Sequence, residues 1–323
     1  MEGIETIVRY LNRSGPTSGS ELGEALGISR MAVQKRIQAL IDMGLPVSAT
    51  RGVGYILDSD VGLLQADQIE SLLIPTIADL TESVEVFQSI ESTNSYLLTQ
   101  SFEPNRARVC MAESQTSGRG RRGNNWQSTP YKNIMLSVSW SFDHWPATIT
   151  GLGLAVGLVI AEYLNNQLGV NAKIKWPNDI LVDNHKIGGI LVDVSGESSG
   201  CCNVVIGLGL NVNQENWSSE VAYQWVDLAS LGVAIERNEL AADLISVLVA
   251  MLSRYEEAGF TPMTERWNVM NGYAGQIVRV GTGSQAFVGR MQGVDENGAL
   301  LIDVGGEIKR VDDSSLSVRL VVD

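Results

Sequence analysis

The residues best suited to chemistry form a glycine- and arginine-rich segment, QTSGRGRRGNNW, between Gln115 and Trp126. Glycine lets a backbone approach a ligand closely, and arginine holds phosphates and carboxylates through paired hydrogen bonds. The glycines match the spacing G-x-G-x-x-G, but Asn124 and Asn125 follow instead of a helix, which argues against a dinucleotide-binding loop. We expect a cationic loop that closes over anionic groups; the plain alternative is an exposed basic loop.

Three consecutive polar residues, Ser92-Thr93-Asn94, follow a strand predicted at 84–88 and begin a helix. Such residues are typical helix caps, and a cap is the simplest interpretation of the motif taken alone. The functional alternative is a small cradle of hydroxyl and amide groups for a neutral polar group.

A second group of polar residues lies between 173 and 213, where the pattern predicts three antiparallel strands. Ile174-Lys175-Trp176 is strand-like, Pro177-Asn178-Asp179 interrupts this strand, and Asp183-Asn184 forms a turn before Lys186. The strand that carries Lys186 also carries Gly188 and Gly189, and glycine in a strand leaves room for a ligand. Lys186 could therefore hold a carboxylate and a phosphate together; the alternative is an ordinary surface lysine.

The first 57 residues predict three short helices followed by a β-hairpin. Ser18 and Glu21 form a capping pattern and Gly27 ends the helix; Ser29 then caps a second helix with one apolar face, Val33, Ile37, Leu40 and Ile41. A helix, a short turn and a second helix make a helix-turn-helix. The hairpin at 47–57 would be its wing.

The outward residues of the second helix suit DNA bases. Arginine pairs with guanine and glutamine with adenine in the major groove, so we expect DNA contacts from Arg30, Gln34, Lys35, Gln38 and, in the wing, Arg51. Four basic residues against one acid between 29 and 51 give +3, although the whole chain carries −14. DNA binding depends on such local patches more than on net charge. The alternative is a solvated helix face.

Composition indicates a soluble cytoplasmic protein. The chain has 323 residues, 44% of them apolar, and three cysteines, Cys110, Cys201 and Cys202, too few for a disulfide framework. The N-terminal residues lack the pattern of a signal peptide. The most apolar stretch, 147–161, is shorter than the roughly 20 residues of a membrane span, so we expect a buried helix and no membrane partner.

Taken together, these motifs resemble the biotin protein ligase family in order and spacing, along essentially the whole chain. The residues that carry the resemblance are Ser92-Thr93-Asn94, Gly118 to Gly123, Lys175 to Asp179 and Lys186-Ile187-Gly188-Gly189-Ile190-Leu191. The N-terminal module resembles that of the bifunctional bacterial members, which also repress the biotin operon. One departure is Asn124-Asn125, where more basic residues would be expected.

The resemblance implies an α/β (α+β) fold in three domains. They are a winged helix-turn-helix at 1–60, a catalytic domain at 61–272 with a mixed sheet like that of class II synthetases, and an SH3-like small β-barrel at 273–323. Short apolar strands separated by glycine turns between 276 and 320 agree with the last of these. The helix expected at 238–255 would close the central domain.

The resemblance also assigns the site residues. Biotin would contact Ser92, Thr93, Asn94, Gln115, Arg119, Gly120, Arg121 and Lys186, and the nucleotide would contact Arg119, Arg121, Trp126, Asp179 and Asn211. Lys186, Arg121 and Asp179 would be catalytic. Asp179, the only acid inside a core motif, would also lie near Mg²⁺ and could accept a proton from the acceptor lysine.

The expected reaction joins biotin and ATP to give biotinyl-5'-AMP, from which biotin passes to a lysine of the biotin carboxyl carrier protein of acetyl-CoA carboxylase. Biotinyl-AMP would also be the corepressor that promotes a homodimer on operator DNA. A lipoate ligase is the nearest alternative enzyme, but the N-terminal module and the Lys175–Asp179 motif argue against it. A ligand-sensing repressor without catalysis is the other alternative, and the arginine loop with Lys186 argues against that.

Overall fold

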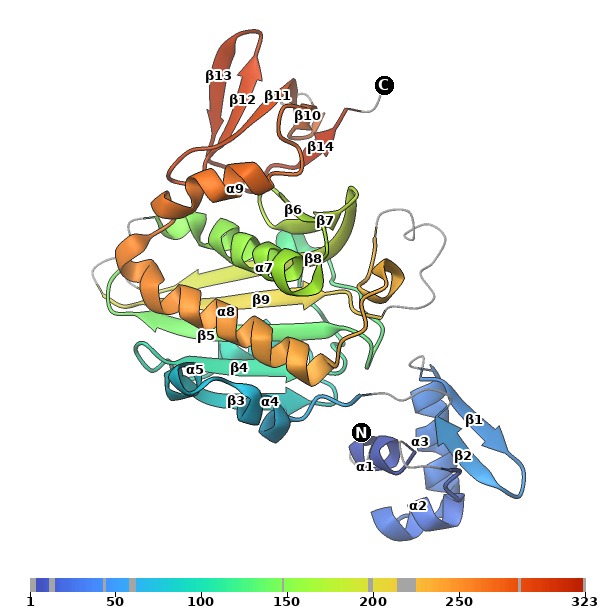
Figure 1. Ribbon diagram of the computed structural model, residues 1–323. Helices are drawn as coiled ribbons and strands as arrows, with labels where there is room; N and C mark the ends of the chain where they lie inside the picture. The colour runs from blue at the N-terminus through green and yellow to red at the C-terminus, as the bar shows by residue number, and fades with distance from the viewer. Residues whose placement is uncertain are drawn as a thin grey trace.

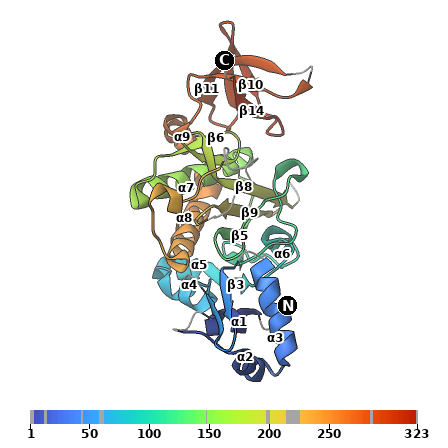
Figure 2. The same cartoon turned by 90° about the vertical axis from the view of Figure 1, so that its right-hand side faces the viewer.

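The computed structural model describes residues 4–11, 15–42, 45–57, 62–146, 148–196, 200–213, 225–283 and 286–321. Three β-sheets organise this part of the chain: one of two strands, one of seven and one of five. Figures 1 and 2 show them as three successive bodies, with the N-terminal module at one end and the C-terminal sheet at the other. The expected boundary at residues 60 and 61 lies outside the described residues.

The N-terminal module consists of α1 (Ile4–Leu11), α2 (Gly19–Leu26), α3 (Arg30–Asp42) and the hairpin β1 (Val47–Thr50) and β2 (Gly54–Leu57). The Ser18 hydroxyl caps α2 by accepting from the backbone N–H of Glu21, and Gly27 ends the helix in a left-handed conformation. Val33, Ile37 and Leu40 of α3 are buried as expected, but Ile41 is exposed. The prediction that Ile41 shares the core face is wrong. Ile41 directly follows the buried Leu40, and the turn of the helix between the two residues carries its side chain towards solvent.

The central sheet has the strand order β3-β4-β5-β9-β8-β7-β6, with β3 and β4 parallel and all other neighbours antiparallel. Its strands are β3 (Thr81–Phe87), β4 (Ala107–Ala112), β5 (Ile134–Phe142), β6 (Ala172–Lys175), β7 (Asp179–Val182), β8 (His185–Ser195) and β9 (Cys202–Leu210). Every residue of β5 is buried. This is expected for a central strand that is covered on both faces.

The helices α7 (Leu152–Leu168) and α8 (Arg237–Ala258) lie across one face of this sheet (Figure 1). The segment Ile149–Leu168 is the one helix of the described chain that is long and apolar enough to cross a membrane, and 61% of its apolar window is buried inside the protein. It is the helix expected from the apolar stretch at 147–161, whose first residue, Ala147, lies outside the described residues. Smaller helices are α4 (Ala66–Leu72), α5 (Pro75–Leu80), α6 (Thr93–Leu97) and α9 (Thr264–Met270), with short 3₁₀ turns at 121–123, 149–151, 229–231 and 261–263.

The C-terminal part is a five-stranded antiparallel sheet with the order β13-β12-β11-β10-β14. Its strands are β10 (Ile277–Val280), β11 (Phe287–Val294), β12 (Leu300–Val304), β13 (Glu307–Val311) and β14 (Val318–Leu320). The side chain of Trp176 donates to the carbonyl of Gly298 at 3.2 Å. This sheet therefore contacts the central domain close to the Lys175–Asp179 motif.

A buried ion pair fastens the segment that follows the N-terminal module. Arg237, at the start of α8, pairs with Glu113 at 2.7 Å, and the two side chains are 7% and 0% exposed. Arg237 also donates to the carbonyl of Gly62, and Glu113 accepts from the backbone N–H of Leu64 at 2.8 Å. Leu63 packs in the core of the N-terminal module, so this pair joins that module to the end of β4.

Candidate active site

A cavity of about 640 Å³ lies on the sheet face opposite α7, between α6, the arginine loop and strands β5, β8 and β9. Strand alternation decides which side chains reach it: Ile190 and Val192 point towards glycines of α7, so Gly189 and Asp193 face the other way. Ten of the residues singled out in the sequence line this cavity, namely Ser92, Thr93, Asn94, Gln115, Arg119, Gly120, Arg121, Trp126, Asp179 and Lys186.

Glycines on β8 and β9 make room for the indole of Trp126. A Cβ on Gly209 would overlap this ring, and one on Gly189 would lie 3.1 Å from its Cζ3 atom. Lys186 Nζ lies 5.5 Å from the Trp126 ring centroid and 5.8 Å from that of Trp225. The indole N–H of Trp126 is buried and has no hydrogen-bond partner in the described part of the chain, so it is available to a ligand.

Lys186 is held by Asp179 on the neighbouring strand β7. The hairpin between them turns at Asp183 and Asn184, whose φ values of 48° and 64° suit a tight two-residue turn. Lys186 Nζ lies 2.6 Å from Asp179 Oδ1, and Lys175 Nζ lies 2.9 Å from Oδ2. The turn therefore sets a cationic amine at the cavity wall.

The same two lysines control the charge of Asp179. Burial raises the pKa of this carboxyl, but the attraction of Lys186 and Lys175 outweighs burial and holds the pKa below its usual value. A carboxylate with a lowered pKa is a poor proton acceptor. The expectation that Asp179 acts as the general base is not supported by this geometry; the side chain positions the two lysines instead.

Hydroxyl and amide groups line the inner end of the cavity. Thr93 donates from its backbone N–H to Gln115 Oε1 at 2.8 Å and from its hydroxyl to the same atom at 3.1 Å. The buried hydroxyl of Ser137, on β5, lies 2.7 Å from Thr93 Oγ1 and 2.6 Å from Asn94 Oδ1. Ser92 caps α6 by accepting from the N–H of Ser95. The Ser92–Asn94 motif can therefore cap α6 and also line the cavity with polar groups.

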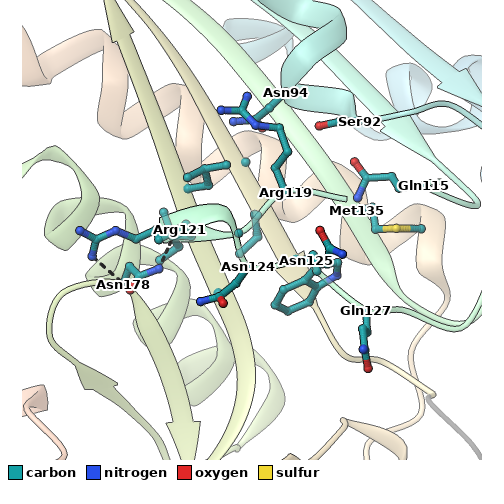
Figure 3. A pocket seen from close by; sticks show the side chains of 18 of the residues that line it. Ser92, Asn94, Gln115, Arg119, Arg121, Asn124, Asn125, Gln127, Met135 and Asn178 are labelled. Atoms are coloured by element: carbon teal, nitrogen blue, oxygen red, sulfur yellow. Dashed lines mark hydrogen bonds between the residues drawn. The ribbon is translucent and has the colours of Figure 1, made fainter. Parts of the chain in front are cut away.

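Two of the three arginines of the loop, Arg119 and Arg121, point in different directions (Figure 3). Arg119 extends towards Asn94 and forms a paired interaction with Asp193, at 3.1 and 3.2 Å. Arg121 turns towards Asn178, at 3.4 Å, and contacts Ser314 of the C-terminal sheet. Burial lowers the pKa of Arg121, and so does its neighbour Arg122. The loop is thus fastened on one side to β8 and on the other to the C-terminal part.

Asn211 does not reach the cavity wall. Its side chain is fully buried and donates to the backbone carbonyls of Lys186 at 3.3 Å and Val226 at 3.1 Å. The structure therefore places Asn211 behind the strand, where it supports the backbone of Lys186. The sequence could not distinguish this position from one on the open face.

The residues do not form a metal site by themselves. The described part of the chain contains no group of three His, Cys, Asp or Glu side chains that could hold a metal ion. Both oxygens of Asp179 are occupied by lysine amines, whose positive charges oppose a cation at the same place. The assignment of Mg²⁺ to Asp179 is therefore not supported, and magnesium would arrive with the phosphates of ATP.

Three functional neighbours were missed in the sequence. Asp193 pairs with Arg119, Ser137 contacts Thr93 of the Ser92–Asn94 motif, and the ring of Trp225 lies 5.7 Å from that of Trp126 at a tilt of 50°. Of these three residues, only Asp193 could have been recognised from the sequence. It is an isolated acid on the glycine-bearing strand, at the alternation that faces the cavity.

The residues expected to contact DNA are all exposed on the N-terminal module. Arg30, Gln34, Lys35 and Gln38 lie on one side of α3 and Arg51 lies at the tip of the hairpin. Met31, 81% exposed, projects beside Arg30 and had not been singled out. Gln38 donates to Asp42 at 2.8 Å, so its amide would have to change partners to contact a base.

Comparison with known protein families agrees with this architecture. Residues 86–211 match the biotin/lipoate A/B protein ligase family, residues 4–56 match a helix-turn-helix domain, and residues 273–317 match the biotin protein ligase C-terminal domain. The three matches fall on the seven-stranded sheet, the N-terminal module and the five-stranded sheet, respectively.

Individual relatives extend along nearly the whole chain. The bifunctional ligase/repressor BirA of Salmonella typhimurium is 38% identical over 97% of this chain and 97% of its own length. BirA of Escherichia coli is 38% identical over 94% and 92%. Among solved structures, biotin protein ligase from Aquifex aeolicus in complex with biotin and ATP superposes with a TM-score of 0.65 at 24% identity, covering 74% of this chain and 99% of its own. That likeness supports the fold.

Proposed function

This chain belongs to the bifunctional ligase/repressor branch of the biotin protein ligase family, and on that premise we propose how its cavity works. The protein is an ATP-dependent biotin ligase with a helix-turn-helix repressor domain. The observation that carries the site assignment is the meeting of three sequence motifs in one cavity: the Ser92–Asn94 cradle, the arginine loop and Lys186.

The first step joins biotin to the nucleotide. A biotin carboxylate oxygen attacks the α-phosphorus of ATP, the bond to pyrophosphate breaks, and biotinyl-5'-AMP remains. The carboxylate is already ionised at neutral pH, so no base is needed. The difficulty is to bring two anions together, and we assign the screening of their charge to Lys186 and Arg121. Arg119 and Gly120 hold the loop closed over the product.

The cradle and the aromatic residues would divide the substrates between the two ends of the cavity. We assign the neutral ring of biotin to Ser92, Thr93, Asn94 and Gln115, whose hydroxyl and amide groups match neutral polar atoms. We assign the nucleotide to the end that holds Trp126, with its unpaired indole N–H, and Asp179 beside Lys186. Asn211 contributes through the backbone that it supports.

In the second step the amine of an acceptor lysine attacks the acyl carbon, the bond to AMP breaks, and the departing proton goes to solvent. Asp179 is an unsuitable acceptor for that proton, because Lys186 and Lys175 stabilise its charged form. We propose the biotin carboxyl carrier protein as the acceptor. We expect the protein to work in the cytoplasm, where its free cysteines stay reduced.

The arginine loop provides the most direct test. In Arg121→Gly, biotinyl-AMP should leave the enzyme faster than from the unaltered protein, while biotin alone binds nearly as before, because Arg121 is assigned to the phosphate end. Released adenylate would acylate lysines of an added bystander protein such as albumin. Equal lifetimes of the intermediate on both proteins would refute the assignment of Arg121.

We also propose that biotinyl-AMP promotes a homodimer that binds operator DNA. One helix-turn-helix contacts one half-site, and specific affinity usually requires two. Support comes from β8, which pairs with β7 only between His185 and Gly189. Beyond Ile190, one side of β8 has no strand partner in the described chain, and Val194 is 42% exposed. An edge of this kind can pair with the same strand of a second copy.

A further inference from the structure

A chain of polar contacts runs along the cavity wall and links the Ser92–Asn94 motif to the arginine loop. It begins at Ser137, passes to Asn94 at 2.6 Å, continues from Asn94 Nδ2 to Asp193 Oδ2 at 2.9 Å, and ends at Arg119. Gly207 makes the close approach of Asn94 possible, because a Cβ at that position would overlap the Asn94 amide. The residues come from four separate segments, so only the folded sheet brings them together.

Asp193 is the central member of this chain. Its carboxylate accepts from Asn94 on one oxygen and from both terminal nitrogens of Arg119, and its side chain is 23% exposed. An unpaired carboxylate here would repel the two anions that the reaction brings together. The pairing with Arg119 removes that repulsion and at the same time ties the loop to β8.

Arg119 differs from Arg121 in this respect. The fork of its guanidinium group is already matched by a carboxylate of the chain itself, which is the strongest arrangement available to arginine. Within the described part of the chain, Arg121 donates hydrogen bonds to the neutral groups of Asn178 and Ser314, and the carboxylates of Asp179 and Asp313 attract its charge without a hydrogen bond. The charge of Arg121 therefore remains available for a phosphate, whereas that of Arg119 is largely used within the protein.

We propose that Asp193 is a positioning residue for biotin activation: it holds Arg119, and with it the backbone at Gly118–Gly120, against the inner end of the cavity, and it fixes the amide of Asn94. This inference rests on the proposed function. It predicts that Asp193 acts on biotin more than on ATP, because both side chains that it holds lie at the biotin end.

The test compares Asp193→Asn with the unaltered full-length protein. Loss of the charged interaction should weaken biotin binding, measured by calorimetry without ATP, by roughly tenfold. The KM for biotin in a pyrophosphate-release assay should rise by a similar factor, with little change in the KM for ATP. Asp193→Glu, which keeps the charge, should recover part of the loss.

A double-mutant cycle separates positioning through Arg119 from a general weakening of the fold. If Asp193 acts through Arg119, then Arg119→Gln and the double variant with Asp193→Asn should bind biotin about equally. The matched control is Glu82→Gln, which removes the charge that pairs with Arg108 on β3 and β4; the Glu82 side chain is 21% exposed, close to the 23% of Asp193. This control should bind biotin as the unaltered protein does.

Biotin binding by Asp193→Asn equal to that of the unaltered protein would overturn the inference, and so would additive effects in the cycle. Failure of the proposed function would look different, since the unaltered protein and Glu82→Gln would then neither bind biotin nor release pyrophosphate from biotin and ATP.

Discussion

Lys186 is the residue that we propose the chemistry needs and the fold does not. Its amine faces the cavity, while its partner Asp179 keeps a second lysine, Lys175. In Lys186→Ala, adenylate formation should fall by roughly 10²–10³-fold, the usual loss when one charge-stabilising group is removed. Pyrophosphate release measures the rate, and circular dichroism should show an unchanged fold.

The control for this prediction is Lys309→Ala, which removes an exposed lysine that lies over Phe287 in the C-terminal sheet. It should release pyrophosphate at the unaltered rate. If both lysine variants were equally active, Lys186 would have no special part in the first step.

The lowered pKa of Asp179 has a consequence for stability. A carboxyl whose pKa is lower in the folded than in the unfolded protein stabilises the fold above its unfolded pKa, about 3.9. That contribution disappears as the pH falls through the folded value. Asp179→Asn should therefore unfold more easily than the unaltered protein at pH 7, and the difference should shrink below about pH 4.

Urea unfolding at a series of pH values measures this difference directly. A gap between the two proteins that persisted unchanged at pH 2 would mean that the Asp179 charge is not its source. Adenylate formation in the unaltered protein should show no loss of activity from Asp179 between pH 5 and 7, because its carboxyl stays charged there.

The sequence analysis singled out residues whose pattern is local. The arginine loop, the Ser92–Asn94 motif and Lys186 are short patterns, and the structure gathers them in one cavity. The sequence analysis missed Asp193 and Ser137, because their partners lie 74 and 43 residues away along the chain. Only the register of the sheet brings these residues close to their partners. Asn211, which follows β9, lies behind Lys186 and not at the cavity wall, and spacing alone does not reveal such a position.

At the scale of elements, the buried ion pair of Glu113 and Arg237 leads to a prediction about the free energy of unfolding. Removing one partner from such a pair leaves a charge without compensation inside the protein, which typically costs about 3–5 kcal/mol. Arg237→Met should therefore lower the free energy of unfolding by about that amount. The double variant with Glu113→Gln should recover part of it, because no charge is then left buried.

Chemical denaturation followed by tryptophan fluorescence would measure both variants. A double variant no more stable than Arg237→Met would show that the lost hydrogen bonds from Arg237 to the carbonyls of Gly62 and Asn133, and not the unpaired charge, set the cost. Arg254→Met, on an exposed turn of α8, is the control and should change stability little.

Elements were predicted more reliably than their ends. The long helix expected at 238–255 runs from Arg237 to Ala258, and the strand expected at 84–88 begins earlier, at Thr81. Of the helix expected at 61–73, whose first residue lies outside the described residues, the structure shows Ala66–Leu72, which packs against α8. Apolar spacing identifies a helix, but contacts far along the chain decide where it stops.

At the scale of the whole molecule, the proposed ligand-promoted dimerisation can be tested. Addition of biotin and ATP should shift the sedimentation mass from monomer towards dimer, and operator affinity should rise with it. Val194→Lys places a charge on the free edge of β8, a substitution that discourages edge-to-edge pairing. This variant should form biotinyl-AMP normally but remain monomeric.

Two observations would count against this assembly. One is a Val194→Lys protein that dimerises as the unaltered protein does, which would place the interface elsewhere. The other is an operator affinity that does not respond to biotin and ATP, which would leave the DNA-binding module and the enzyme as independent parts of one chain.

The end of β4 serves two purposes at once. Glu113 holds the segment that leads to the N-terminal module, and Gln115, two residues later, contacts Thr93 in the cavity. If ligand in the cavity strengthens binding to DNA, thermodynamic linkage requires DNA to strengthen retention of that ligand by the same factor. A molecule on its operator would then hold its adenylate more tightly, and tight binding to DNA would keep it from meeting an acceptor protein. Each occupied operator would remove working enzyme from the cell, so the number of binding sites in a genome would itself limit the biotinylation capacity.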